Sequence, residues 1–309
     1  MIDGEPWYDS ALDVHVPELV AINDQVRAFL NNALSVTDPV KLAATRAMAA
    51  EQRATARRDD FTDRFIDGPG GPLRLRCKSP ASPSAVLLDI HGGAFCMGSP
   101  DDGDHLNAAY IKRANVAVVS VDYRLAPEHP YPAGPDDCEA AAVWLLNNAA
   151  NEFGTDRLMI TGTSAGGNLA AVTLLRLRDR HDALDQVIGA NLVYGGYDLS
   201  GTPSQINQDK VSFRAVYLPT IPVGDRKVYD ISPLYADLTG MPPALFTVGT
   251  NDYLYDDNLF MYMRWRAAGS RAQLAIYPEA MHGFTSMPSA MGVEANRRMI
   301  AWTAAITGA

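Results

Sequence analysis

Residues 162–167 read Gly-Thr-Ser-Ala-Gly-Gly and place a serine between glycines in the pattern G-x-S-x-G. The pattern directly follows an apolar segment at 157–161 and opens a helical pattern at 165–180. A serine on such a tight strand-to-helix turn is exposed, and the flanking glycines lack the β-carbons that would collide there. The helix amino terminus adds free N–H groups and partial positive charge. This context predicts Ser164 as a nucleophile, against the plainer interpretation of an ordinary serine in a glycine-rich turn.

A second glycine-rich segment, His-Gly-Gly-Ala-Phe at residues 91–95, also follows an apolar segment. Paired glycines let backbone N–H groups approach a carbonyl oxygen that becomes negative during reaction. One donor to that oxygen comes from the residue after the nucleophile, here Ala165, and the others come from this second loop. Within the loop we favour Gly93 and Ala94 and leave Gly92 open as a further donor.

A nucleophilic serine needs a base, and behind a turn of this type the acid and then the histidine follow the serine along the chain. His181 falls late in the helix after the serine, where an exposed position is expected. His282, just after the last apolar segment, is therefore the predicted base. We interpret His91, which precedes the serine, as a ring that hydrogen-bonds its own loop into shape.

Three aspartates follow the apolar segment 244–248 and compete for the role of the acid. Asp252 lies where the loop leaves the predicted strand, at the carboxyl end where sites of parallel sheets assemble. Asp256 and Asp257 fall in the first turn of the next helix, where acidic residues complement the helix dipole. We predict Asp252 as the residue that orients the histidine, and the other two as capping charges.

Apolar, β-branched segments alternate with helical patterns through most of the chain, which predicts an α/β fold with a mostly parallel sheet flanked by helices. An antiparallel hairpin at the start makes the sheet mixed. Strands are predicted at residues 61–67, 73–77, 85–90, 116–121, 157–161, 187–194, 244–248 and 273–277. Helices are predicted at residues 104–114, 136–150, 165–180, 255–268 and 290–305.

Two regions break this alternation. Residues 1–58 show helical patterns at 16–34 and 39–55 and no strand signal, and residues 199–235 form a long connection with weak periodicity. The first helical pattern carries an apolar stripe that an isolated helix pair cannot bury. The stripe consists of Leu19, Ile22, Val26, Phe29 and Leu30. We predict that both regions form a helical cap over a catalytic domain of residues 59–309.

The bulk composition limits the partners of this chain. Its 309 residues are 47% hydrophobic and 20% charged, which is typical of a globular protein with a sizeable core. The net charge of −10 makes nucleic acids and anionic lipid surfaces poor partners. The expected partner is a small-molecule substrate, and the sequence leaves a homodimer open.

The three cysteines, Cys77, Cys96 and Cys138, are too few and too far apart for a disulfide framework or a zinc site. Buried free thiols in a reducing compartment are expected instead. The amino terminus lacks a basic region followed by an apolar stretch, and no segment approaches the roughly 20 apolar residues of a membrane span. The sequence therefore predicts a cytoplasmic protein without a membrane span.

Five segments together resemble the hormone-sensitive-lipase-like carboxylesterases, bacterial esterase family IV. They are His-Gly-Gly at 91–93, Asp-Tyr-Arg-Leu-Ala-Pro-Glu at 122–128, the 162–167 motif, Asp-Tyr-Leu at 252–254 and His-Gly-Phe at 282–284. The resemblance covers roughly residues 60–305. It implies an eight-stranded α/β-hydrolase core, a cap built from the amino-terminal helices and a later insertion, and activity on esters of short to medium acyl chains.

Three positions depart from the family pattern, and all bear on substrate preference. Thr163 replaces a common aspartate, Ala94 a common third glycine and Tyr253 a common proline. Within the 122–128 segment we expect Arg124 and Glu128 to pair and hold the turn near the second glycine loop.

The predicted reaction is serine-dependent ester hydrolysis through an acyl-enzyme, with no metal or organic cofactor. An amidase, a lactonase or a carbamate hydrolase would use the same residues and differ in pocket shape. A non-catalytic ligand receptor on the same fold is the alternative from another class. The presence of both His282 and Asp252 in the required order argues against a receptor.

Overall fold

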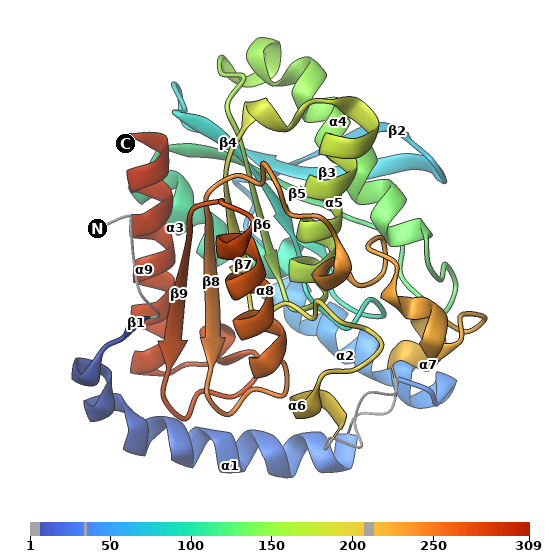
Figure 1. Cartoon of the computed structure of the whole chain (residues 1–309), viewed down its shortest axis with the longest axis vertical. Coiled ribbons are helices and arrows are strands. Elements are labelled where there is room, and N and C mark those ends of the chain that lie inside the picture. The colour runs from blue at the N-terminus through green and yellow to red at the C-terminus, as the bar shows by residue number, and fades with distance from the viewer. Residues whose placement is uncertain (1–6, 34–35, 207–212) are drawn as a thin grey trace.

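The computed structural model describes residues 7–33, 36–206 and 213–309, and its centre is one nine-stranded sheet (Figure 1). The strands follow the order β1-β9-β8-β7-β6-β4-β5-β3-β2. Their bounds are β1 Trp7–Tyr8, β2 Thr62–Gly68, β3 Gly71–Lys78, β4 Ala85–Ile90, β5 Val116–Val121, β6 Leu158–Thr163, β7 Val187–Val193, β8 Ala244–Gly249 and β9 Ala272–Tyr277. The helices are α1 Val16–Ala33, α2 Pro39–Ala56, α3 Asp104–Ala114, α4 Ala133–Phe153, α5 Ala165–His181, α6 Pro203–Ile206, α7 Phe213–Tyr217, α8 Tyr255–Ala267 and α9 Ala290–Thr307.

The sheet is parallel except at one edge, where β3 runs antiparallel to both β2 and β5. All eight predicted strands are present, and the α/β-hydrolase fold that the family resemblance implied is confirmed. The expectation of no strand near the amino terminus was wrong, because Trp7 and Tyr8 pair in parallel with Ala275 and Ile276 of β9. Two residues are too few to produce a readable alternation in the sequence.

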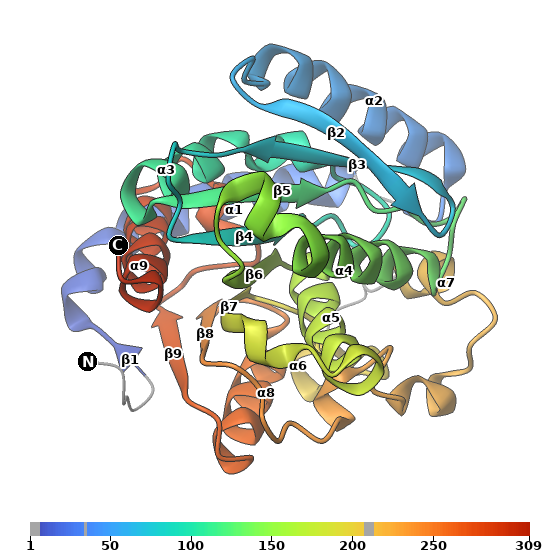
Figure 2. The ribbon, with the colours of Figure 1, turned by 90° about the horizontal axis from the view of Figure 1, so that it is seen from above.

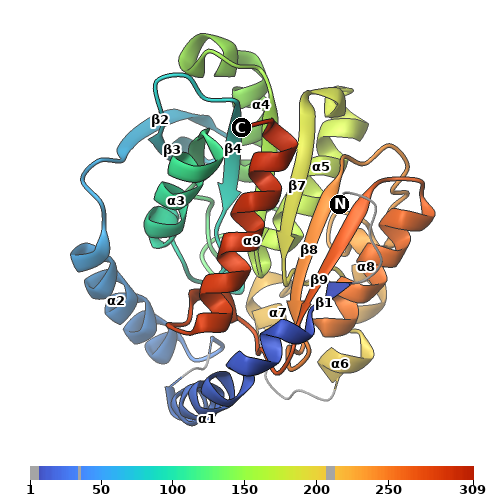
Figure 3. The ribbon, with the colours of Figure 1, turned by 90° about the vertical axis from the view of Figure 1, so that its left-hand side faces the viewer.

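Helices cover both faces of the sheet, as Figure 2 shows in a view along its layers. The α3 and α9 helices pack together on one face, and Figure 3 shows α9 crossing the sheet with α3 beside it. The α4, α5 and α8 helices cover the other face. Because both faces are covered, the central strands are continuous apolar segments without an exposed side.

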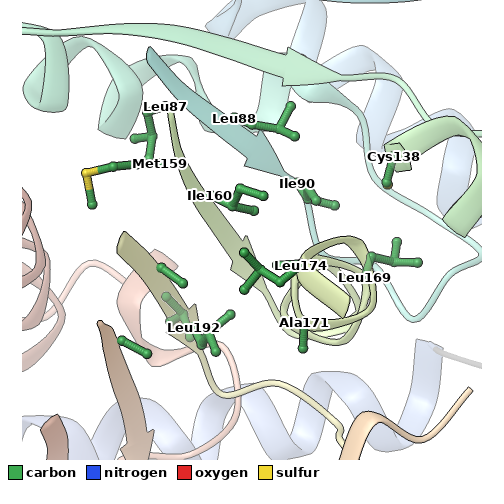
Figure 4. Close-up of a cluster of buried hydrophobic side chains, with 14 of the residues drawn as sticks. Leu87, Leu88, Ile90, Cys138, Met159, Ile160, Leu169, Ala171, Leu174 and Leu192 are labelled. Atoms are coloured by element: carbon green, nitrogen blue, oxygen red, sulfur yellow. The ribbon is translucent and has the colours of Figure 1, made fainter. Parts of the chain in front are cut away.

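The core on either side of the sheet follows from the alternation of side chains along β4 and β6. Leu87 pairs with Met159 and Leu88 with Ile160, so each pair shares one face. Figure 4 shows Ile160 on the side of Leu174 from α5, and Met159 pointing away from that helix. All five side chains are buried. This packing fixes the strand that carries Ser164 at its carboxyl end.

The α1 helix lies across the carboxyl ends of the strands, and α2, α6 and α7 lie toward the same end (Figure 1). Asp38 caps α2 through the N–H groups of Val40 and Lys41, with Pro39 in its first turn. On α1, Leu19 is fully buried and Ile22 is partly buried. The side chains of Val26, Phe29 and Leu30 lie outside the described residues.

The three cysteines are free and buried, as predicted. Within the parts of the chain that the structure describes, no helix is both long and apolar enough to cross a membrane.

Candidate active site

Ser164 occupies the turn between β6 and α5 with an unusual backbone, at φ 58° and ψ −117°. Such a conformation is strained for a residue with a β-carbon and persists only where the surroundings enforce it. Here the surroundings are backbone atoms. A β-carbon on Gly162 would lie 2.0 Å from the carbonyl oxygen of Gly166, and one on Gly166 would lie 1.9 Å from that of Ile90. Only glycine fits at these two positions, as the motif predicted.

The three residues predicted as nucleophile, base and acid meet at the carboxyl ends of β6, β8 and β9. The Oγ atom of Ser164 lies 2.7 Å from Nε2 of His282. The Nδ1 atom of His282 lies 3.0 Å from each carboxylate oxygen of Asp252. The Asp252 side chain is fully buried, and the His282 side chain is 21% exposed. The imidazole is thus held between a buried carboxylate and a hydroxyl that faces the solvent side.

The loops that carry Asp252 and His282 are pressed together by their backbones. The N–H of Asn251 donates to the carbonyl oxygen of Ala280 at 3.0 Å. A β-carbon on Gly249, the last residue of β8, would lie 1.9 Å from the same oxygen. The Asp252 carboxylate also accepts the N–H of Leu254 at 2.8 Å. This contact fixes the carboxylate independently of the imidazole.

The loop after β4 has three successive residues with positive φ: Gly93 at 119°, Ala94 at 55° and Phe95 at 60°. No hydrogen bond within the described residues uses the N–H of Gly93, Ala94 or Ala165. Gly92 lies directly against the nucleophile turn, since a β-carbon there would lie 3.3 Å from that of Ser164. The loop therefore brings unused N–H donors to the side of the predicted nucleophile.

His91 has the supporting role that the sequence predicted. Its Nδ1 atom hydrogen-bonds the carbonyl oxygen of Gly92 at 2.7 Å, and its ring stacks on Tyr123 with centroids 4.2 Å apart. The Tyr123 hydroxyl donates back to the His91 carbonyl oxygen at 3.0 Å. Burial lowers the pKa of His91, which keeps the ring neutral.

Two tyrosines flank His282, and sequence reasoning did not assign either of them to this role. Tyr194 lies edge-on with its centroid 5.0 Å from the imidazole, and Tyr253 lies at 4.7 Å. The hydroxyl of Tyr194 shares a 2.6 Å hydrogen bond with Thr285. Tyr194 directly follows β7, so the same rule that found Asp252 at a strand end could have found it.

The predicted pairing of Arg124 with Glu128 was wrong. Arg124 instead forms a two-pronged ion pair with Asp137 of α4, at 2.8 and 2.9 Å. Glu128 pairs with Arg46 of α2 at 2.7 Å. The error has a physical reason, because charge complementarity within one short segment carries no information on partners supplied by separate helices.

Asp257 was predicted as a capping charge, but it is fully buried. It accepts the N–H groups of Tyr197 and Asp198 at 2.7 and 2.8 Å, and side-chain hydrogen bonds from Thr202 and Gln205. Burial raises its pKa to about 6 even though these donors favour the charged form. Asp257 thus ties α8 to the start of the 199–235 region.

Two cavities adjoin the loops. The first has about 20 Å³ and contacts Ser164 itself. It is lined by Ala94, Phe95, Ser164, Ala165, Gly196, Leu199, Phe213, Tyr253 and Leu254. The second, of about 570 Å³, lies between α3 and α9 and reaches His91, Gly92 and Thr163. Ser164, Asp252 and His282 do not line the larger cavity, whereas Ser164 lines the smaller one.

Comparison with known proteins identifies the family of the chain. A family profile described as alpha/beta hydrolase fold matches residues 87–286. Carboxylic ester hydrolase LipN of Mycobacterium tuberculosis is 32% identical over 290 residues, which span 88% of this chain and 77% of that protein. Carboxylesterase NlhH of the same species is 36% identical over 213 residues, which span 65% of this chain and 66% of that protein.

Among solved structures, an esterase from Pyrobaculum calidifontis superposes with a TM-score of 0.81 and 28% identity, covering 92% of this chain and 98% of that one. Esterase LipW from Mycobacterium marinum superposes with a TM-score of 0.79 and 28% identity, covering 87% and 91%. Sequence, fold and local geometry agree, and the chain belongs to the hormone-sensitive-lipase-like carboxylesterases of the α/β-hydrolase superfamily.

Proposed function

We propose that this protein hydrolyses carboxylic esters through a covalent acyl-enzyme on Ser164. The observation that carries the proposal is the unbroken hydrogen-bonded chain from Ser164 Oγ through both ring nitrogens of His282 to the buried carboxylate of Asp252. Three loops bring nucleophile, base and acid together in the arrangement that acyl transfer needs. The names of the relatives LipN and NlhH support an ester as the bond that is cleaved.

In the proposed mechanism, His282 removes the hydroxyl proton as Ser164 Oγ attacks the ester carbonyl carbon. Asp252 fixes the imidazole with Nε2 toward the serine and stabilises the imidazolium that forms. The imidazolium then gives its proton to the leaving alcohol as the C–O bond breaks. A water molecule, deprotonated by the same imidazole, hydrolyses the acyl-enzyme and returns the serine.

The proposed oxyanion hole consists of the N–H groups of Gly93, Ala94 and Ala165, with Gly92 beside them. Their unused donors and their position next to Ser164 support this assignment. Donors that are fixed before the reaction stabilise the tetrahedral intermediate without reorganising. No cofactor is required in this scheme.

The regions 1–58 and 199–235 are proposed to form the cap that shapes the substrate site. Phe213 of α7 and Leu199 line the small cavity at Ser164, which supports this role for the second region. The small space of about 20 Å³ beside Ser164 supports the shorter acyl groups within the predicted short- to medium-chain range.

A phosphonate with a good leaving group tests the proposal, together with p-nitrophenyl esters from acetate to decanoate, a lactone and an anilide. We expect one phosphonate per chain, located at Ser164 by mass spectrometry, and the highest kcat/KM on the shortest esters. Failure to label Ser164 would support a non-catalytic receptor. Higher kcat/KM on the lactone or the anilide would support the alternative hydrolases. The cytoplasmic location and a homodimer stay predictions.

A further inference from the structure

Arg46 of α2 is the residue that connects the amino-terminal helices to the loop of the proposed oxyanion hole. Its Nε donates to the carbonyl oxygen of Cys96 at 2.8 Å, and one Nη donates to that of Ala126 at 2.7 Å. The guanidinium also forms a two-pronged ion pair with Glu128, at 2.7 and 3.1 Å. The Arg46 side chain is only 27% exposed, so these hydrogen bonds are partly shielded from water.

The loop at residues 91–98 needs such support because it is strained. Ala94 and Phe95 have positive φ angles without being glycine, a backbone conformation that is strained for residues with a β-carbon. The N–H groups of Cys96 and Met97 both donate to the carbonyl oxygen of Gly93, which closes a tight turn around the proposed donors. Arg46 therefore binds a residue, Cys96, whose own N–H helps to close the turn.

The other side of the turn is tied to the same guanidinium. The N–H of Ala126 donates to the carbonyl oxygen of Phe95 at 2.9 Å, and Arg46 holds the carbonyl oxygen of Ala126. The Phe95 ring stacks on Tyr217 of α7 with centroids 3.9 Å apart. Arg46 thus hydrogen-bonds both Cys96, which follows Phe95 in the chain, and Ala126, whose N–H binds the Phe95 carbonyl oxygen.

We propose that Arg46 is a positioning residue for ester hydrolysis, which it supports by holding the 91–98 loop in its strained, donor-presenting conformation. The inference rests on the proposed function, since it concerns the proposed oxyanion hole. Arg46 contacts neither Ser164 nor His282 and acts only through the backbone of the loop. Loss of the clamp lets the loop relax toward negative φ, and the N–H groups of Gly93 and Ala94 move away from the developing oxyanion.

The chain offers a matched control for a purely structural role. Arg53 lies seven positions further along α2 and forms a two-pronged ion pair with Asp102, at 2.7 and 3.3 Å. It anchors the same helix to the body of the protein without touching the 91–98 loop. Removing Arg53 therefore weakens the attachment of α2 but leaves the clamp on Cys96 in place.

The experiment compares Arg46→Ala, Arg46→Lys and Arg53→Ala in the full chain. Steady-state kinetics on p-nitrophenyl acetate give kcat and KM, and a trifluoromethyl ketone, which forms a tetrahedral adduct with a serine, reports transition-state affinity. We expect Arg46→Ala to lower kcat about 10- to 100-fold with little change in KM, and to weaken ketone binding by a similar factor. Arg53→Ala is expected to lower Tm and leave kcat unchanged.

Arg46→Lys keeps the charge but cannot span two carbonyl groups and a carboxylate, so an intermediate kcat is expected. This variant carries the test if Arg46→Ala does not fold. Unchanged kcat in every folded Arg46 variant, or an equal loss in Arg53→Ala, would overturn the inference. An inactive wild type would defeat the proposed function and this inference with it. An active wild type with inactive Ser164→Ala and fully active Arg46→Ala would defeat the inference alone.

Discussion

The loops around Ser164 and the outer segments, residues 1–58 and 199–235, are held in place by different kinds of contact. Around Ser164, backbone lies directly on backbone. β-Carbons added to Gly162, Gly166 or Gly249 would come within 2.0 Å of a carbonyl oxygen. Such contacts leave no space for a side chain to adjust, and they hold the loops rigidly.

The α2 helix is attached by side chains instead. Leu42 is its only buried residue. Arginines in the helix and just after it form ion pairs with the rest of the protein: Arg46 with Glu128, Arg53 with Asp102, and Arg57 with Asp63 and Asp101. Ion pairs of this kind are partly exposed, so each contributes little on its own and responds to salt and pH.

This difference separates two requirements of the proposed enzyme. The reacting groups need positions fixed to a fraction of an ångström, which close backbone packing supplies. A cap, the role proposed for residues 1–58, needs contacts that can be broken and re-formed, and the ion pairs of Arg53 and Arg57 are of this kind. Arg46 is the point where the two kinds of contact meet.

The largest expected effect on kcat is at Ser164, in the closely packed loops. Ser164→Ala should lower kcat by about 10⁴–10⁶-fold while leaving the fold intact, because the nucleophile is lost and the turn accepts a smaller side chain. Steady-state kinetics and circular dichroism measure the two effects. Retention of more than about a tenth of the wild-type rate in pure protein would contradict the assignment, since losses at a nucleophile are far larger.

The next largest expected effect on kcat distinguishes the proposed catalytic acid from two neighbouring aspartates. Asp252→Asn should lower kcat by about 10³–10⁴-fold, because the amide favours the wrong imidazole tautomer. Asp256→Asn is the control and should leave kcat near the wild-type value. Asp257→Asn should instead lower Tm, since the amide meets four hydrogen-bond donors with one acceptor atom. An equal loss of kcat in all three variants would mean that the acid is wrongly assigned.

A glycine comparison tests the packing difference directly. Gly166→Ala places a β-carbon 1.9 Å from the Ile90 carbonyl oxygen and should destabilise the protein by about 3 kcal/mol or more. Gly224→Ala, in the 199–235 region, has no atom within 4 Å of its new β-carbon and should change stability by less than about 0.5 kcal/mol. Urea unfolding measures both values. Similar losses at the two positions would remove the proposed distinction between the regions.

The structure brings the predicted nucleophile, base and acid together, and the sequence could point to this meeting because each residue follows its own strand. Ser164, Asp252 and His282 lie at the ends of β6, β8 and β9, and parallel strands bring those ends to one edge of the sheet. The strands themselves are apolar segments with clear bounds. One chain-order rule was then sufficient to select these residues.

Of the outer segments, residues 1–58 were predicted as two helices and residues 199–235 as a long connection, both as parts of a cap. Their ion-pair partners were not predicted, because such partners leave no periodic signal in the sequence. Nothing near Arg46 in the sequence points to Glu128, which lies 82 positions away. The sequence also did not indicate that Arg124 pairs with Asp137 and not with Glu128, the partner that was predicted. Each arginine could pair with many aspartates and glutamates in the sequence, and only the folded structure determines which of them lies close enough.

Deleting residues 1–35 tests whether the outer contacts shape the substrate site. The deleted α1 buries Leu19, and its Asn23 donates to the Glu279 carbonyl oxygen at 2.7 Å, close to His282 in the chain. We expect hydrolysis of octanoate to fall about tenfold more than that of acetate, which corresponds to about two buried methylene groups. An unchanged chain-length profile in folded protein would contradict the cap, and a uniform loss would indicate general destabilisation.

The smallest expected effect concerns the acid stability of the ion pairs of Asp101, which lies in the short helical turn before α3. Burial opposes the ionisation of Asp101, but hydrogen bonds from Arg74 and Ser99 overcome it and lower its pKa to about 2. An unfolded aspartate has a pKa near 3.9, so the carboxylate stabilises the folded state above about pH 4. That stabilisation is lost as the pH falls through the folded pKa, and it should amount to about 1–2 kcal/mol in all. The unfolding free energy of the wild type should therefore approach that of Asp101→Asn between about pH 4 and pH 2.

Asp59→Asn is the control, because this charge is exposed and is not one of the ion-pair partners of Asp101. Parallel profiles for the wild type and Asp101→Asn down to pH 2 would show that the ionised Asp101 carboxylate does not stabilise the folded state.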